Sequence, residues 1–579
     1  MANNQNLAKI FYELAQFLEM DDVAFKPFAY EKAALALENL SEDISSIYKK
    51  EGFEGLKNIP GVGESIAEKI EEYLKTGKIK YYEEYKKKYP MNIEELTAVE
   101  GIGPKMVKML WKELKIKNLK DLETAAKAGK IRNLFRFGEK TEQNILQGIN
   151  FLKRERGRFL LGEILPVVKE IINSLKSLKE IKNISEAGSV RRRKETIGDV
   201  DILTTLKTKK DAEKIIDFFV NLPGIEKIWA KGPTKASVRR KEGFDVDLRV
   251  VSEKSYGSAL QYFTGSKEHN ISLRQIAIDK GLKLNEYGLF KSKKMIAGKT
   301  EEEIYKKLGM DIMEPELREN TGEIEAAIKG KLPKIIKLSD IKGDLHVHSN
   351  WDGGENSIEE IAKAAINRDY EYIGVADHTK FLRVEHGLNE KQLLERNKQI
   401  EKLNKKLEIE NYKLKILTGC EANIMPDGSI DIKDEVLKKL DYAIAGVHSQ
   451  FKMSRDEMTK RIITAMKNPN IDIISHPTGR IIQKRDEYQI DFDKILKAAK
   501  ATNTILEINS FPERLDLKDV YIKKAKEAGV KMIINTDAHH IDQLRFMEYG
   551  VFQARRGWAE KEDIINTKTL SSLLKFLRK

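Results

Sequence analysis

Hydrophobic residues in segment 1–150 recur with helical spacing and are interrupted by turns that contain glycine. Strand-like alternation of β-branched and polar residues is almost absent there, so the pattern predicts a series of short helices. Similar hairpins, each with a glycine just before a helix, occur at 59–70 and 99–110, and a looser copy occurs at 134–145. The segment is therefore expected to be all-α.

The pattern changes to strands from about residue 184. Segments 199–206 and 245–251 alternate as strands do, and a helix is predicted between them at 211–222. The stretch 329–344, with its lysines and proline, is expected to be a linker. After it, short apolar strands alternate with helices to the end, which predicts a β/α barrel.

The length of 579 residues predicts about three to five domains. With 41% hydrophobic and 34% charged residues, the composition is that of a globular protein. The single cysteine, Cys420, rules out a disulfide framework and favours a reducing cytoplasm. Since neither a signal peptide nor a membrane-spanning run is visible, we expect a soluble cytoplasmic protein with no membrane partner.

The net charge of +13 is concentrated in one part of the chain. Residues 101–300 contain 43 Lys and Arg against 24 Asp and Glu, an excess of 19. Such a local excess is typical of a nucleic-acid-binding groove, and a lysine-rich solvated surface is the alternative.

The glycine hairpins suggest how DNA would be held. Gly61, Gly63, Gly101 and Gly103 would let the backbone approach a phosphate, and the N–H groups at the following helix start point toward it. A plain tight turn is the alternative for either copy. Contacts of this kind carry no sequence preference and weaken with salt.

The stretch GSVRRRKETIGDVD, residues 188–201, places basic residues beside Asp199 and Asp201. In a strand these two acids point to the same face, where they can share a pair of divalent ions. Asp245 and Asp247 offer a third carboxylate from a second strand. A salt-bridged acidic strand is the alternative interpretation.

Ordered motifs across this region resemble the family X DNA polymerases, the polymerase beta type. They are GS at 188–189, RR, GDVD at 198–201, VDLR at 246–249 and YFTGS at 262–266. The resemblance implies a nucleotidyltransferase palm in which Asp199 and Asp201 bind both Mg²⁺ or Mn²⁺ ions and Asp247 is the third catalytic and metal-binding carboxylate. Asp245 is then only a neighbour.

The same resemblance implies which residues contact the incoming dNTP and the DNA. The nucleotide-binding residues would be Gly188, Ser189, Arg192, Gly198, Tyr262, Phe263, Gly265 and Asn270. Arg274 would contact the DNA near the primer terminus. Core packing is the alternative for the aromatic pair.

The helical N-terminus is also similar to the family's gap-binding domain. The resemblance aligns Lys69 with a lysine that can act as a lyase nucleophile on an abasic sugar. Ser65 and Glu31 stand where a relative would carry basic groups for the 5′ phosphate, so a solvated helix lysine is the alternative.

Eight of the nine histidines lie between residues 346 and 540, and most of them follow an apolar strand. In a β/α barrel the carboxyl ends of the strands meet at one mouth, so these residues are expected to line one pocket. The pattern resembles the PHP (polymerase and histidinol phosphatase) domain, a distorted barrel. The implied metal ligands are His346, His348, Asp352, His378, Glu421, His448, His476, Asp537 and His539. The mixed ligands suit up to three ions of Mn²⁺, Zn²⁺ or Fe²⁺, and Arg480 would bind a substrate phosphate or form a salt bridge.

We therefore expect a DNA-directed DNA polymerase that fills short gaps in base excision repair, fused to a PHP 3′–5′ exonuclease. Removal of 3′ phosphates and incision at abasic sites are further activities that the resemblance implies. The partners would be gapped or primed duplex DNA and dNTPs, and the chain a monomer. The alternatives are a DNA-binding phosphatase of the histidinol-phosphatase type and a nonenzymatic DNA-end-binding protein.

The expected fold is multidomain, with two all-α helix-hairpin-helix domains, an α+β palm and the PHP barrel. The expected boundaries are 1–85 and 86–155 for the helical domains, 156–253 for the palm, 254–320 for the nascent-base-pair subdomain, 321–341 for the linker and 342–579 for the barrel.

Overall fold

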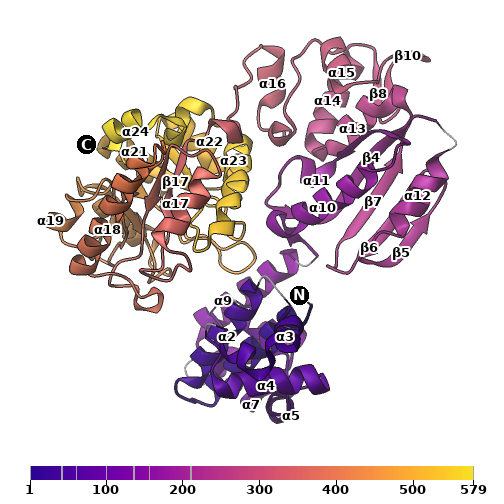
Figure 1. Ribbon diagram of the computed structural model, residues 1–579. Helices are drawn as coiled ribbons and strands as arrows, with labels where there is room; N and C mark the ends of the chain where they lie inside the picture. The colour runs from indigo at the N-terminus through magenta and orange to yellow at the C-terminus, as the bar shows by residue number, and fades with distance from the viewer. Residues whose placement is uncertain are drawn as a thin grey trace. The chain divides into compact units, whose positions relative to one another are not determined.

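The structure is a computed structural model of the whole chain (Figure 1). It describes all residues except 1, 41–42, 60, 100, 135–136, 156, 209–210 and 578–579. The chain divides into two compact units, Met1–Arg156 with Gln483–Arg485, and Gly157–Ile482 with Asp486–Lys579. Within the described residues, no helix combines the length and the apolar character needed to span a membrane.

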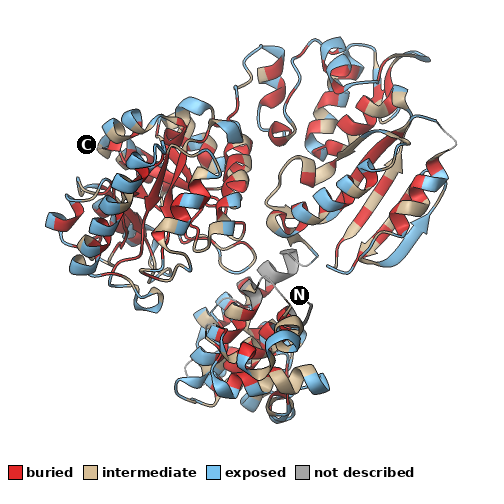
Figure 2. Ribbon diagram, in the orientation of Figure 1, coloured by how far each residue is buried: buried red, intermediate tan, exposed pale blue. Residues whose placement is uncertain are grey.

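The first unit is all-α, as predicted. Its helices are α1 (Ala2–Met20), α2 (Lys26–Asn39), α3 (Ile44–Lys57), α4 (Glu64–Thr76), α5 (Lys80–Lys88), α6 (Ile93–Thr97), α7 (Pro104–Leu114), α8 (Leu119–Lys127) and α9 (Glu139–Glu155), with a 3₁₀ turn η1 at Ile131–Asn133. One apolar cluster runs through them, from Leu7 on α1 to Ile149 on α9 (Figure 2). Part of the third predicted hairpin, residues 135 and 136, lies outside the described residues.

The palm is a five-stranded sheet of order β2-β4-β7-β6-β5. Its strands are β2 (Ile181–Glu186), β4 (Asp199–Leu206), β5 (Ile225–Lys231), β6 (Lys235–Arg240) and β7 (Asp245–Val250), and its helices are α10 (Leu161–Lys176), α11 (Gly188–Arg191) and α12 (Ala212–Val220). Two short strands, β1 (Phe159–Leu160) and β3 (Thr196–Ile197), pair separately. Val200 and Ile202 of β4 pack with Ile215 of α12 in one core, so one sheet face is covered by helices.

The segment after the palm is a small α+β subdomain. It contains η3 (Glu253–Ser255), α13 (Tyr256–Thr264), α14 (Lys267–Asp279), β8 (Lys283–Asn285), β9 (Gly288–Lys291), β10 (Lys294–Ala297), α15 (Glu301–Lys307), η4 (Pro315–Leu317) and α16 (Glu323–Ile328). The stretch 321–341, expected to be a linker, differs from that expectation at its start. Ile324 and Ala327 of α16 are buried in the same apolar core as Leu273 and Tyr305.

The C-terminal part is a distorted parallel barrel, which confirms the predicted fold. Its strands are β11 (Gly343–Val347), β12 (Tyr372–Val375), β13 (Lys415–Thr418), β14 (Glu421–Asn423), β15 (Ile444–Gly446), β16 (Ile473–Ile474), β17 (Ile505–Asn509) and β18 (Met532–Asn535). They form sheets β11-β12-β13 and β14 to β18. Single parallel bridges, His378 to Glu421 and Val347 to Ala538, join the two sheets.

The barrel strands are buried on both faces, as Figure 2 shows by their colour, which is why they read as apolar runs. The helices around them are α17 (Ile358–Ile366), α18 (Glu390–Ile409), α19 (Asp434–Leu437), α20 (Arg455–Met466), α21 (Phe492–Thr502), α22 (Asp519–Ala528), α23 (Met547–Arg556) and α24 (Leu570–Leu577), with 3₁₀ turns η5 (Leu338–Asp340), η6 (Arg383–Glu385), η7 (Ile541–Phe546), η8 (Lys561–Asp563) and η9 (Ile565–Thr567).

Candidate active sites

The acidic residues of the palm lie on two neighbouring parallel strands. β4 and β7 pair so that Asp199 is opposite Asp245 and Asp201 is opposite Asp247. Since side chains alternate across a strand, these acids share the face opposite the buried Val200. The common face expected from the period-2 pattern is therefore present.

The charges of these acids reach one another. Burial, followed by the charges of Asp199 and Asp247, raises the pKa of Asp201 to about 6. In the described part of the chain, however, the three-ligand groups with all donor atoms within 4.8 Å lie between residues 346 and 539. The palm acids therefore form a looser cluster, which a divalent ion would draw together.

Asp247 is held by side chains of its own strand and of β6. It pairs with Lys235 at 2.9 Å and with Arg249 at 3.3 Å, and it accepts a hydrogen bond from the Ser237 hydroxyl. The Arg249 guanidinium also lies over the Phe263 ring, 4.6 Å from its centre. Carboxylate oxygens suit Mg²⁺ and Mn²⁺, and such an ion would compete with Lys235 for Asp247.

Asp245 belongs to a different set of contacts. It pairs with Arg239 at 3.0 Å and accepts a hydrogen bond from the indole Nε1 of Trp229 at 2.9 Å. Trp229 is half exposed and lies on the edge strand β5. These contacts fit the expectation that Asp245 is a neighbour of the catalytic acids.

The three consecutive arginines are each paired with an internal acid. The pairs are Arg191–Glu301 at 2.7 Å, Arg192–Glu319 at 3.0 Å and Arg193–Glu186 at 2.9 Å. Gly188 has φ +60, and a Cβ there would lie 3.3 Å from Asp201 Oδ2. A larger residue would therefore crowd the acids, while the contacts of Ser189, Arg192 and Gly198 with a triphosphate remain predictions.

The aromatic pair expected near the nucleotide lies at the end of α13. The Tyr262 and Phe263 rings meet edge to face, with centres 5.2 Å apart. Asn270 donates to the Tyr262 carbonyl at 2.7 Å, and exposed Arg274 donates to the Asn270 carbonyl at 3.1 Å. A Cβ on Gly265, which has φ +71, would lie 3.0 Å from Arg192 Nη1. The structure thus brings Arg192 beside this predicted sugar-binding segment.

The two glycine hairpins have nearly the same backbone. Gly61 and Gly101 have φ +86 and +84, and Gly63 and Gly103 are the extended N-cap residues of α4 and α7. A Cβ on Gly63 or Gly103 would meet no atom within 4 Å. Open space before two equivalent helix starts is what phosphate contacts require.

Lys69 lies on α4 and its ammonium is held locally. Nζ donates to the Ser65 carbonyl at 3.0 Å and to its hydroxyl at 3.1 Å, and it lies 5.4 Å from the centre of the Tyr81 ring. Burial lowers the pKa of Lys69. These contacts are consistent with both interpretations of Lys69, a lyase nucleophile and an ordinary solvated helix lysine.

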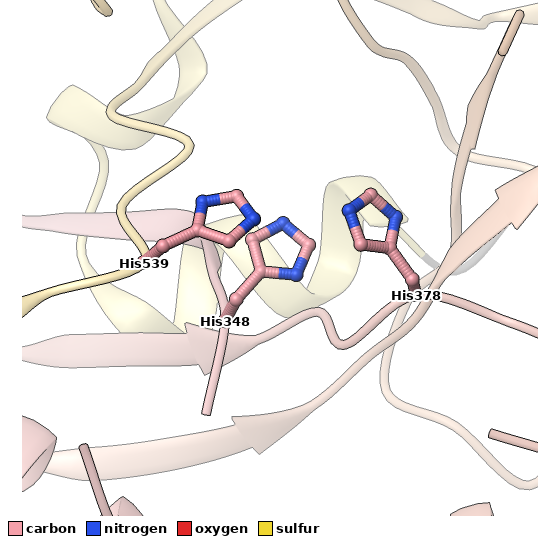
Figure 3. Close-up of side chains that lie close together, drawn as sticks. All are labelled: His348, His378 and His539. Atoms are coloured by element: carbon pink, nitrogen blue, oxygen red, sulfur yellow. The ribbon is translucent and has the colours of Figure 1, made fainter. Parts of the chain in front are cut away.

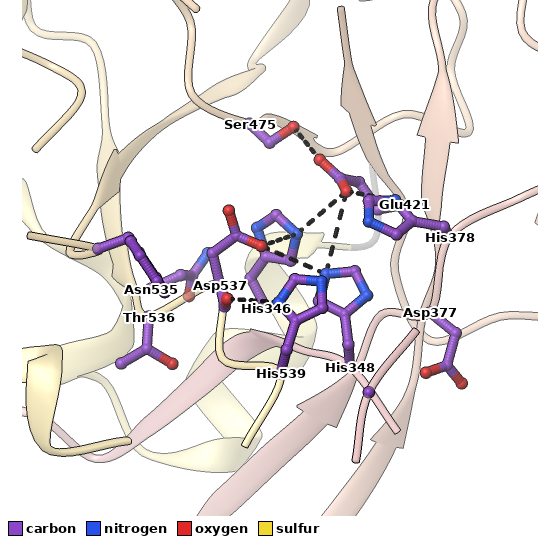
Figure 4. Close-up of polar contacts among 12 residues, drawn as sticks. His346, His348, Asp377, His378, Glu421, Ser475, Asn535, Thr536, Asp537 and His539 are labelled. Atoms are coloured by element: carbon purple, nitrogen blue, oxygen red, sulfur yellow. Dashed lines mark hydrogen bonds and ion pairs between the residues drawn. The ribbon is translucent and has the colours of Figure 1, made fainter. Parts of the chain in front are cut away.

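The nine positions predicted as metal ligands converge in the barrel. Figure 4 shows His346, His348, His378, Glu421, Asp537 and His539 around one space. His348 is central: its ring lies 4.1 Å from His539 and 4.3 Å from His378, centre to centre (Figure 3). The strands therefore bring together residues that lie up to 193 positions apart in the sequence.

Several buried nitrogen and oxygen atoms of this cluster make no hydrogen bond within the described residues, although His378 Nδ1 lies 2.8 Å from Glu421 Oε2. They are His346 Nε2, His348 Nε2, His378 Nδ1, Glu421 Oε2 and His476 Nδ1. Among the residues that the structure describes, four compact groups could hold an ion: His348–His378–His539, His346–His348–Asp537, His378–Glu421–His448 and His348–Asp352–Asp377. Buried polar atoms without partners are costly, so nitrogen and oxygen donors gathered in this way fit divalent metal ions.

Charge interactions within the cluster are strong. Burial alone would lower the pKa of His348, but Asp352 raises it to about 10. Burial lowers the pKa of His448 and of His539 to about 4. Because metal binding requires neutral imidazoles and ionised carboxylates, loading the site must release protons.

The sequence interpretation missed an acid behind the ligands, Glu507 on β17. Its Oε1 lies 2.7 Å from His346 Nδ1, and its Oε2 accepts the His476 backbone N–H at 2.8 Å. The side-chain amide of Asn509 donates a hydrogen bond to Asp537 Oδ2 at 3.0 Å. Such contacts orient ligands. The only sequence signal was the strand TILEIN, whose Glu507 is polar in an otherwise apolar run.

Asp352, expected to be a ligand, also supports its neighbours. Its Oδ2 lies 2.8 Å from His348 Nδ1 and accepts the His378 backbone N–H at 2.7 Å. Next to it, buried Asp377 pairs with Arg396 at 2.9 Å and accepts the Ser349 N–H at 2.6 Å. Asp377 was also missed, although it directly precedes a predicted ligand in VADH.

Arg480 forms a salt bridge, the second of its two predicted roles. It pairs with Glu195 at 2.7 Å, and both are in the same compact unit. Burial would lower the pKa of Arg480, but the Glu195 charge raises it. Arg480 thus links the barrel to the palm.

Comparisons with known families match most of the chain. Helix-hairpin-helix models match residues 2–79 and, as a SAM-like tandem, 93–150. The DNA polymerase beta thumb model matches residues 259–319, and the PHP domain model matches residues 344–511. Family models thus match both predicted halves of the chain, the polymerase half through its thumb and the C-terminal half through its PHP domain.

Relatives of known name fall into two groups. The DNA polymerase/3′-5′ exonuclease PolX of Bacillus subtilis (strain 168) is 36% identical over 582 residues, which is 100% of both chains. A probable phosphatase of Thermoanaerobacter sp. (strain X514) is 32% identical over 251 residues, which covers 41% of this chain and 94% of the relative. A probable phosphatase of Caldanaerobacter subterraneus subsp. tengcongensis is 33% identical over 227 residues, 37% of this chain and 80% of the relative.

Proposed function

The chain belongs to the family X DNA polymerases of the PolX type, and we propose that it fills short gaps in duplex DNA with its palm and degrades DNA from 3′ ends with its PHP barrel. The observation that carries the polymerase assignment is the register of β4 and β7, which sets Asp201 opposite Asp247. The nuclease assignment is carried by the nine predicted positions in the barrel: eight belong to the compact groups, and His476 Nε2 lies 3.0 Å from Glu421 Oε1.

In the palm, Asp199, Asp201 and Asp247 would hold two Mg²⁺ or Mn²⁺ ions. Ions at such a site activate the primer hydroxyl and neutralise the leaving pyrophosphate. Arg192 would orient the triphosphate, because a guanidinium satisfies two phosphate oxygens at once. The Tyr262 and Phe263 rings would pack against the sugar.

In the barrel, the histidines and acids would hold up to three ions of Mn²⁺, Zn²⁺ or Fe²⁺, which their mixed donors suit. Bound there, the ions supply a nucleophile at neutral pH and a clamp for the scissile phosphate. The chain itself orients the ligands: Glu507 holds His346 and Asp352 holds His348. Removal of 3′ phosphates and incision at abasic sites would use the same residues.

The glycine hairpins would hold the duplex by its phosphates. Their equivalent backbones, with open space before α4 and α7, support this role. Binding should be nonspecific and should fall by about 0.9 log units per log unit of salt for each phosphate contacted. We expect a monomer, since one chain supplies both candidate sites.

The comparisons do not favour the alternative function, a small-molecule phosphatase. The relative that matches the whole chain is named a DNA polymerase/3′-5′ exonuclease, whereas the probable phosphatases match 41% and 37% of it. A small-molecule phosphatase would hydrolyse histidinol phosphate and would leave DNA 3′ ends intact.

A gap-filling assay separates these functions. With a one-nucleotide gap, dNTPs and Mg²⁺, Asp201→Ala should lower extension about 10³-fold by weakening the two-metal site and leave 3′ degradation intact. His346→Ala should do the converse with Mn²⁺. Loss of both activities in either variant would show that the two sites are not separate.

A further inference from the structure

Glu319 is a carboxylate shared by the polymerase half and the barrel. Its Oε1 accepts a hydrogen bond from Arg192 Nε at 3.0 Å and another from Arg556 Nη1 at 3.1 Å. Arg192 follows α11 in the palm, whereas Arg556 is the last residue of α23 in the barrel. All three residues are in the same compact unit.

Arg556 makes further hydrogen bonds, one of them to the backbone of the palm. Its Nη1 also donates to the backbone carbonyl of Arg192 at 2.9 Å, and its Nη2 donates to Asp519. The Arg556 side chain is only 3% exposed. A buried guanidinium with this many partners has one orientation.

Arg192 is in turn fixed on two sides. Besides the bond from Nε to Glu319, its Nη1 donates to the Thr264 carbonyl at the end of α13. Within the described part of the chain, Nη2 makes no hydrogen bond. The absence of a side chain on Gly265 leaves room for this arrangement, since a Cβ there would lie 3.0 Å from Nη1. One edge of the guanidinium is thus left for an anion.

We propose that Arg556 of the barrel is a positioning residue for nucleotide incorporation, acting through Glu319 on Arg192. The inference rests on the proposed contact of Arg192 with the incoming triphosphate. Glu319 fixes the plane of the Arg192 guanidinium, and Arg556 fixes Glu319. The nuclease half thereby completes the triphosphate site of the polymerase half.

The charges favour this chain of contacts. Burial would raise the pKa of Glu319, but Arg556 and Arg192 lower it, so the carboxylate is ionised at neutral pH. Glu319 and Asp519 balance the charges of Arg192 and Arg556, and Lys194, whose Nζ lies 3.9 Å from Glu319, adds a further positive charge beside them. Groups held in place before the ligand arrives lose less entropy when it binds.

The first test measures KM and kcat for the dNTP on a one-nucleotide gap. Arg556→Met should raise KM about tenfold, the loss expected for one charge-assisted hydrogen bond, with kcat changed less than about twofold. Arg556→Lys keeps the charge and should recover part of the loss. An unchanged or lowered KM for Arg556→Met would overturn the proposal.

A double-mutant cycle tests the route through Glu319. If Arg556 acts through this acid, Glu319→Gln with Arg556→Met should be no worse than the more impaired single variant. Effects on KM that add up would overturn the proposal. Glu319→Gln conserves volume, and thermal melting of each variant verifies that the chain is folded.

Arg480 and Arg192 provide the control variants for this route. Arg480→Met breaks the buried pair with Glu195, which also joins barrel and palm but does not contact Arg192, and it should leave the KM unchanged. A rise equal to that of Arg556→Met would mean that any loosening of the interface has this effect, which would overturn the specific route. Arg192→Ala should raise KM more than Arg556→Met; if it does not, the proposed role of Arg192 itself fails.

Discussion

The palm and the barrel hold their candidate metal ligands in opposite ways. In the palm, Asp199 is exposed and Asp247 is engaged by Lys235, so the acids share a face without forming a compact cage. In the barrel, His346 and Glu421 are fully buried and lie close together, with His346 Nε2 3.4 Å from Glu421 Oε2. The barrel ligands are thus already gathered into compact groups, whereas the palm acids are not.

Removal of metal should show this difference most strongly. The barrel should retain metal ions through desalting without chelator, whereas the palm should not. Chelation should then destabilise the barrel by roughly 4 kcal/mol if the ions are present at about 1,000 times their Kd. Metal analysis and thermal melting measure the two effects. Equal metal content in wild type and His346→Ala would contradict the assignment.

Glu507→Gln should weaken the preassembled site without touching a metal. The amide has one oxygen instead of two, so either the His346 ring or the His476 backbone N–H loses its acceptor. Metal affinity should fall about 10- to 100-fold. It is measured by titrating Mn²⁺ into protein from which the metal has been removed with a chelator. The matched control is Asp493→Asn, an exposed acid paired with Lys524. Equal affinities of Glu507→Gln and the control would remove Glu507 from the site.

Acid should loosen the polymerase half through an ion pair. Burial would raise the pKa of Glu301, but Arg318 and Arg191 lower it from 4.5 to about 2. The stabilisation is therefore present above pH 4.5 and is lost as the pH falls toward 2. Urea unfolding between pH 6 and 3 should show less pH dependence for Glu301→Gln. If the unfolding free energy of the variant changes with pH as steeply as that of the wild type, the acid sensitivity comes from other groups.

The smallest effect is expected at Lys69, the candidate for a third centre. Lys69→Ala should change stability by no more than about 0.5 kcal/mol, as for most surface substitutions. Borohydride trapping on DNA with an abasic 5′ end tests the lyase role. An adduct that forms with the wild type and disappears in Lys69→Ala would establish the nucleophile.

Local patterns were sufficient for most of the fold. The strand 199–206 is β4 to the residue, and the helix predicted at 211–222 contains α12, because period-2 and helical spacing report which face is buried. The segment 321–341 was misleading at its start, because α16 shares a buried apolar core with residues of α14 and α15, and local composition does not reveal such distant partners.

The sequence by itself determined the types of metal ligand, their order and the two strand motifs. The reason is that only a few residue types can bind a metal ion or a phosphate. Only the tertiary structure decided what surrounds them. Glu507 supports His346 across 161 positions, and Arg556 meets Glu319 across 237. Such contacts depend on how strands and helices pack. The residues near a side chain in the sequence do not indicate which distant residue it will contact.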